Sequence, residues 1–236
     1  MTAVPQEPAV ATLAAPQWTE CTGDAAFLQA AIARILERAA EAIAARGRFL
    51  LVLAGGDTPR AIYENLASHP CDWNRWHLFL SDERCLPEGH PARNETMVRK
   101  AWTGRAAIPP DQFVTPKGTD PVAAAMTYAQ ALDQAGLFDL VLLGLGEDGH
   151  TASLFPGHPA GDTAGAPAAL PVFGAPKPPP ERVTMSARRL CEAEHVLFLA
   201  KGAGKRDALT AWRAGAPLPA TWIRGRATTE ILWSGS

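Results

Sequence analysis

The chain has 236 residues, of which 47% are hydrophobic, and it carries a formal net charge of -2. This length fits one large domain or two small ones, and the hydrophobic fraction is sufficient for a sizeable core. The near-neutral charge gives no reason to expect nucleic acid or a membrane surface as a partner. No apolar run of about 18 residues and no secretory signal pattern is present, and the four cysteines are scattered. We therefore expect a cytoplasmic protein with reduced thiols.

Hydrophobic patterns along the chain predict alternating helices and strands. Residues 1–20 are rich in Pro and Ala, and we expect them to be loosely ordered. Large apolar residues at helical spacing predict a helix over 24–46, and the short apolar run 48–54 predicts a buried strand. The following segment, 58–67, has the pattern of a helix with a proline near its start. Further strands are expected at 77–81, 138–144, 195–200 and 230–233, and further helices at 94–102 and 121–135.

This alternation is typical of a mainly parallel, doubly wound, Rossmann-like α/β sheet with helices on both faces. Residues 157–181 are rich in Pro, Gly and Ala. Because strands are predicted on both sides of this segment, we expect a long surface loop within a single domain over 21–236.

The stretch GLGEDGHTASLFPG, residues 144–157, contains the G-x-G-x-x-G spacing of a dinucleotide-binding turn. Such a turn normally opens the first strand–helix–strand unit, and an acidic residue follows about 20 positions later. Here the glycines lie past the middle of the chain, and the segment about 20 residues beyond Gly149 has no acid. The context therefore argues against a nicotinamide cofactor.

Polar residues follow three of the predicted strands. Gly55, Gly56, Asp57 and Thr58 come after the first, where small residues at a helix N-terminus can present N–H groups to an anion. Asp82, Glu83 and Arg84 follow the second.

The third strand runs into a glycine turn that carries Asp148 and His150. Histidine titrates near neutrality, so His150 could act as a general base, although a turn histidine satisfied by backbone partners is the simpler alternative. Three polar strand ends on one sheet edge favour a site for a phosphate-carrying substrate.

These motifs together resemble a known family. The segments LAGGDTP, LSDER with Asn94 ten residues later, LGLGEDGHTASLFPG, RVT and GAGK are similar to those of 6-phosphogluconolactonases over residues 24–233. Glucosamine-6-phosphate deaminase, of the same glucosamine/galactosamine-6-phosphate isomerase superfamily, shares the Gly-Gly loop and a similar histidine turn. It typically has Asp-Glu-Tyr where this chain has DER, and an Ala-Phe-Asn-Glu-Pro run where this chain has TASLFPG. These differences favour the lactonase.

The resemblance implies hydrolysis of 6-phospho-D-glucono-1,5-lactone to 6-phospho-D-gluconate, the second step of the oxidative pentose phosphate pathway. His150 would take a proton from the attacking water, Asp148 would orient the ring or cap the turn, and Arg84 would assist. The expected substrate and phosphate ligands are Gly55, Gly56, Asp57, Thr58, Asp82, Asn94, Gly149, Arg182 and Lys205. We expect no cofactor and no metal, and a monomer or weak homo-oligomer. A deaminase or other sugar-phosphate isomerase, or a non-catalytic sugar-phosphate-binding regulator, remains an alternative.

Two positions depart from the family pattern. The loop usually reads Gly-Gly-Ser-Thr-Pro, and Asp57 replaces the serine. A carboxylate about 4 Å from a phosphate charge would cost on the order of 4 kcal/mol at an effective dielectric constant near 20. We therefore expect Asp57 to cap the following helix while pointing away, or to be compensated by Arg93, which replaces a usual serine, or by Arg60 or Arg84. Cys85 is expected close enough to the site to be modified by thiol reagents.

Overall fold

A seven-stranded parallel sheet forms the centre of the computed structural model, which describes residues 15–235. The strand order is β1-β10-β9-β6-β2-β3-β5, and each neighbouring pair is parallel. The strands are β1 (Gln17–Glu20), β2 (Phe49–Leu53), β3 (Trp76–Leu80), β5 (Phe113–Val114), β6 (Phe138–Gly144), β9 (Ala193–Lys201) and β10 (Thr228–Ser234).

The central strands are mostly apolar because both faces of the sheet are covered. All five residues of β2 are buried. Successive side chains of a strand point to opposite faces, so Leu51 and Leu53 join one core cluster while Leu50 and Val52 join the other. The continuous apolar runs in the sequence thus reflect a sheet buried on two sides.

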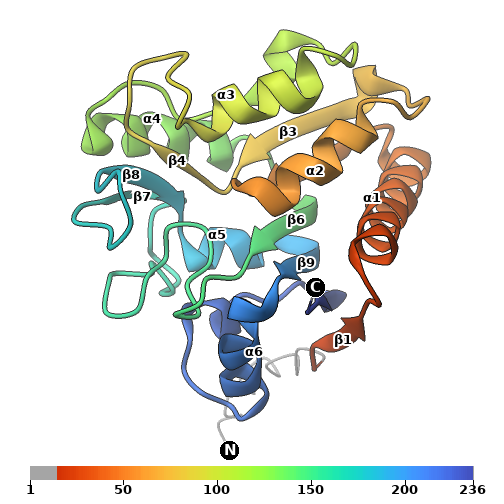
Figure 1. The fold of residues 1–236 in the computed structure, drawn as a ribbon. Helices are drawn as coiled ribbons and strands as arrows, with labels where there is room; N and C mark the ends of the chain where they lie inside the picture. Colours follow the sequence, from red (N-terminus) through yellow and green to blue (C-terminus); the bar gives the residue numbers. More distant parts are fainter. Residues whose placement is uncertain (1–14, 236) are drawn as a thin grey trace, which may run out of the picture.

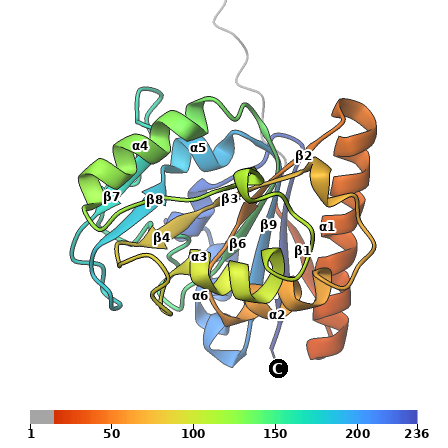
Figure 2. The ribbon, with the colours of Figure 1, turned by 90° about the horizontal axis from the view of Figure 1, so that it is seen from above.

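Helices pack on both faces of the sheet (Figures 1 and 2). One face is covered by α1 (Asp24–Arg46), α2 (Asp57–Leu66) and α3 (Asn94–Val98), which continues into a π-helical turn at Arg99–Thr103. The other is covered by α4 (Pro121–Asp133), α5 (Ala187–Cys191) and α6 (Arg206–Arg213). Short 3-10 helices occur at Trp73–Arg75, Pro110–Gln112, Ala203–Lys205 and Pro219–Trp222. The expected α/β fold with a doubly wound parallel sheet is confirmed. Within residues 15–235, no helix is both long and apolar enough to cross a membrane.

A smaller antiparallel sheet corrects the expectation of a long loop over 157–181. In the described part of the chain it has the order β4-β8-β7, with β4 (Asp82–Arg84), β8 (Arg182–Met185) and β7 (Ala169–Val172). The segment 157–181 is therefore not an unbroken loop, because it contains β7. A proline lies within β7, which is compatible with its place at the edge of the sheet.

The N-terminal segment also differs from expectation where it can be seen. Residues 17–20 form β1, which pairs with β10 over four residues at the edge of the large sheet. Trp18 anchors this strand, because its ring contacts that of Trp212 at a centroid distance of 5.8 Å. The expectation of loose order is wrong for these residues, and residues 1–14 lie outside the described part.

Candidate active site

Several strands end in polar residues around a cavity of about 320 Å³ at the carboxyl edge of the main sheet. From β2 the chain adds β3 and β5 toward one edge, and then returns to add β6, β9 and β10 on the other side. The point where the strand order reverses, between β2 and β6, is where open α/β sheets bind ligands. The cavity is lined by residues 54–59, 81, 82, 84, 94, 144–146, 150–152, 177, 182, 199, 201 and 205.

Ten of the twelve site residues expected from the sequence line this cavity. They are Gly55, Gly56, Asp57, Thr58, Asp82, Arg84, Asn94, His150, Arg182 and Lys205. Asp148 and Gly149 belong to the turn that carries His150 and do not line the cavity themselves. The cavity therefore brings together residues that are up to 150 positions apart in the chain.

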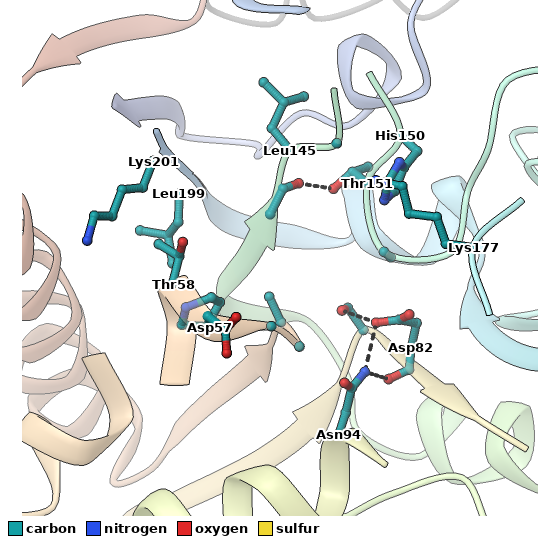
Figure 3. A pocket seen from close by; sticks show the side chains of 18 of the residues that line it. Asp57, Thr58, Asp82, Asn94, Leu145, His150, Thr151, Lys177, Leu199 and Lys201 are labelled. Atoms are coloured by element: carbon teal, nitrogen blue, oxygen red, sulfur yellow. Dashed lines mark hydrogen bonds between the residues drawn. The ribbon is translucent and has the colours of Figure 1, made fainter. Parts of the chain in front are cut away.

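His150 and Asp148 form a hydrogen-bonded pair within the turn after β6 (Figure 3 shows His150 at the cavity). Nδ1 of His150 bonds to Oδ1 of Asp148, and the backbone N–H of His150 donates to the same oxygen at 3.2 Å. The imidazole also packs on the ring of Phe155, with 4.7 Å between centroids. Since Nδ1 is engaged, Nε2 is the ring nitrogen left for a ligand.

The ionisation of Asp148 suits its hydrogen bond to His150. Burial alone would raise the pKa of Asp148, but hydrogen bonding and the charge of His150 outweigh burial and hold that pKa below its ordinary value. Asp148 is therefore ionised at neutral pH and can stabilise a protonated His150. The alternatives of orienting the ring and capping the turn are not exclusive, because Asp148 accepts from both the ring and the backbone.

The glycines of this turn permit its tight fold. A Cβ at Gly146 would lie 2.0 Å from Nδ1 of His150 and 2.5 Å from Oδ1 of Asp148. Gly149 has a φ of 80°, in the left-handed region that favours glycine. The G-x-G-x-x-G spacing is therefore explained locally, because the turn needs glycine where the imidazole of His150 lies against the backbone and where φ is positive.

Asp82 and Asn94 build the buried floor of the cavity (Figure 3). Nδ2 of Asn94 donates to the carbonyl of Asp82 at 2.9 Å, and Oγ of Ser153 donates to Oδ2 of Asp82 at 2.6 Å. A Cβ at Gly55 would lie 2.1 Å from Oδ1 of Asn94, so the first glycine of the Gly-Gly loop allows the loop to touch this floor. Ser153 is buried and bonded to a carboxylate, which does not suit a nucleophile.

Five cationic side chains from residues 15–235 line the cavity: Arg84, Lys177, Arg182, Lys201 and Lys205. Arg182 is buried and donates to the carbonyls of Lys177 and Pro179 at 2.6 and 3.0 Å. It thereby holds the segment before β8 against the cavity. Arg182 also donates to Oγ of Ser153 at 3.3 Å. A guanidinium has five donor hydrogens, so these three bonds leave Arg182 with donors for an anion.

Lys177 and Lys201 were missed by reasoning from the sequence. Lys177 lies within PKPPP, in the segment expected to be a surface loop. Lys201 ends β9, only four residues before the predicted Lys205. The position of Lys201 at the end of a strand was the available signal, since the other polar residues of the site follow strand ends too.

Arg93 does not compensate Asp57, contrary to one of the expectations. Arg93 is buried and its Nη2 lies 3.1 Å from a carboxylate oxygen of Glu95. The expected helix cap is also absent, because Gly56 is the N-cap residue of α2 and no side-chain capping bond forms there. Asp57 is 91% exposed, and Arg60, one turn along the helix, pairs with it at 3.2 Å. Arg60 is thus the compensating cation.

The comparisons with known proteins agree with this arrangement. A model of the family described as glucosamine-6-phosphate isomerases/6-phosphogluconolactonase matches residues 23–233. The 6-phosphogluconolactonase of Streptomyces coelicolor is 37% identical over 87% of this chain and 86% of its own length. That of Synechocystis sp. is 38% identical over 83% of this chain and 84% of its own length.

A solved structure supports the same assignment. The crystal structure of 6-phosphogluconolactonase from Thermotoga maritima superimposes with a TM-score of 0.85 at 30% identity, covering 92% of this chain and 100% of the other. The resemblance inferred from the motifs is confirmed by sequence and by fold. The chain belongs to the glucosamine-6-phosphate isomerase/6-phosphogluconolactonase family.

Proposed function

We propose that the protein hydrolyses 6-phospho-D-glucono-1,5-lactone to 6-phospho-D-gluconate and so serves the oxidative pentose phosphate pathway. The observation that carries the proposal is the His150–Asp148 pair at the edge of a cavity lined by cationic side chains. The names of the relatives support the same substrate.

In the proposed reaction His150 acts as the general base. Its Nε2 takes a proton from a water molecule while the water oxygen attacks the lactone carbonyl, an effect worth about 10²–10⁴-fold in rate. The resulting imidazolium is stabilised by the carboxylate of Asp148. When the ring C–O bond of the tetrahedral intermediate breaks, His150 returns the proton to the departing ring oxygen. One water is consumed, and the product is the open-chain acid.

Positive charge serves both ends of the substrate. We propose that Arg84 stabilises the developing oxyanion, and that Lys205 and Arg182 bind the phosphate together with the loop of Gly56, Asp57 and Thr58. Small residues and the first turn of α2 place backbone N–H groups at this loop, which suits an anion.

A coupled assay tests this function. Glucose-6-phosphate dehydrogenase generates the lactone in place, and the release of acid is followed with and without the protein, with His150→Ala as the matched variant. Acceleration by wild type but not by the variant is expected. A rate equal to spontaneous hydrolysis refutes the proposal. In that case ammonia release from glucosamine 6-phosphate would indicate the deaminase, and binding of 6-phosphogluconate without turnover would indicate a regulator.

A further inference from the structure

Lys201 stands between the active-site cavity and a second cavity of about 260 Å³. The second cavity lies between α1 and α2 and shares Asp57, Thr58 and Lys201 with the first. Nζ of Lys201 donates to Oδ2 of Asp24, at the start of α1, at 2.6 Å. Asp24 lines the second cavity and not the first. Lys201 is therefore directed away from the cavity that holds His150.

The bond to Asp24 is one that a phosphate can replace. The side chain of Lys201 is 33% exposed and that of Asp24 is 62% exposed, so water screens the pair and its stabilising effect is small. A phosphate monoester carries about 1.5 to 2 negative charges at neutral pH and three acceptor oxygens. The four-carbon stem of lysine is flexible enough to exchange one partner for the other.

The position of Lys201 matches the phosphate end of the proposed substrate. In Figure 3, Lys201 and His150 lie on opposite sides of the cavity, and Asp57 and Thr58 lie below Lys201. The phosphate is carried on C6, outside the lactone ring, so a substrate with its carbonyl carbon at His150 can direct its phosphate across the cavity toward Thr58 and Lys201.

The charge of Asp57 gives Lys201 a specific task. Asp57 adds a carboxylate to the cavity rim where the phosphate is expected. Its partner Arg60 does not line the cavity. Lys201 lines the same rim as Asp57, so it can offset that negative charge once its Nζ turns from Asp24 toward a bound phosphate.

We propose that Lys201 is a phosphate-binding residue that rests on Asp24 in the free protein and transfers its donors to the substrate's phosphate on binding. This inference rests on the proposed function, because it takes the ligand to be a sugar phosphate. Asp24 then competes with the substrate for Lys201, and the release of Lys201 favours phosphorylated over unphosphorylated sugars.

Calorimetric titration with 6-phosphogluconate tests the proposal. Lys201→Met should raise Kd about 10-fold, as for the loss of one charge-assisted hydrogen bond. Asp24→Asn should lower Kd severalfold, because Lys201 loses its competing partner. Lys100→Met, which removes an exposed cation outside the cavity, is the matched control and should leave Kd unchanged. Thermal unfolding of each variant checks that it is folded.

The two variants separate phosphate binding from a structural role. If the pair only fastens α1 to β9, both variants weaken binding alike, and the proposal is overturned. A Kd within about twofold of wild type for Lys201→Met overturns it too. The titrations do not depend on turnover. If Kd changes as expected but the protein does not hydrolyse the lactone, the proposed function is refuted while Lys201 remains a phosphate ligand. If the wild-type protein hydrolyses the lactone but Kd is unchanged in Lys201→Met, the proposed function stands and the role of Lys201 is refuted.

Discussion

Gly146 provides the space that the imidazole of His150 occupies. A Cβ at this position would lie 2.0 Å from Nδ1 and 2.3 Å from Cε1 of His150, whereas ordinary contact begins at 3.4 Å. Gly146→Ala must therefore displace the ring or the turn by about 1 Å or more, and a shift of that size in a reacting group can cost about 10²-fold. We expect kcat for the lactone to fall by about 10²-fold.

The coupled lactone assay measures this effect, and Gly165→Ala is the control. A Cβ at Gly165 meets nothing within 4 Å, and the residue does not line the cavity. The control should retain wild-type kcat, while both variants should remain folded by circular dichroism. A folded Gly146→Ala protein with wild-type kcat would refute the reasoning, because it would show that catalysis does not depend on where the turn holds His150.

Four other predictions follow from the site and its surroundings. His150→Ala should lower kcat by about 10²-fold or more and retain binding of 6-phosphogluconate in a titration; near-normal turnover would mean that another group activates the water. Arg93→Ser should lower the free energy of unfolding by about 3 kcal/mol in urea denaturation, because buried Glu83 loses its cationic partner and the carbonyls of Leu86 and Pro116 lose a donor; a neutral effect would contradict that role. Cys85 should react slowly with thiol reagents at pH 8, since burial, with nearby negative charge, raises its pKa to about 11, and labelling as fast as free cysteine would argue against burial. Asp57→Ser should tighten binding of 6-phosphogluconate by less than about 10-fold, measured as Kd.

The main sheet was predictable because its elements are long and strongly patterned. The helix expected over 24–46 and the strand expected over 138–144 coincide with α1 and β6. Their apolar spacing is set by packing against a sheet buried on both faces, so periodicity alone carries the information. The same signal is weak in β4 and β7, which have only three and four residues. In addition, β4 pairs with β8, which lies far along the chain.

The candidate site was predictable to the extent that it is built from strand ends. Parallel strands bring their carboxyl ends to one edge, and this places Asp82 and His150 at one cavity although 68 residues separate them. Lys177 could not be found in this way, because its position depends on Arg182 holding the neighbouring backbone. That contact depends on the tertiary packing of the small sheet, and no hydrophobic periodicity in the sequence predicts it.

Position 57 shows how solvent exposure changes an electrostatic argument made from sequence. The cost of on the order of 4 kcal/mol assumed an effective dielectric constant near 20. Asp57 is 91% exposed, and at the dielectric constant of water the same 4 Å separation costs about 1 kcal/mol. The i,i+3 spacing of α2 also sets Arg60 beside Asp57, whereas Arg93 is turned into the protein toward Glu95. Replacing Asp57 with serine therefore removes a screened and paired charge, and the expected gain in affinity is at most about 10-fold. A larger gain would mean that the carboxylate faces the phosphate in a less solvated setting than the free protein shows.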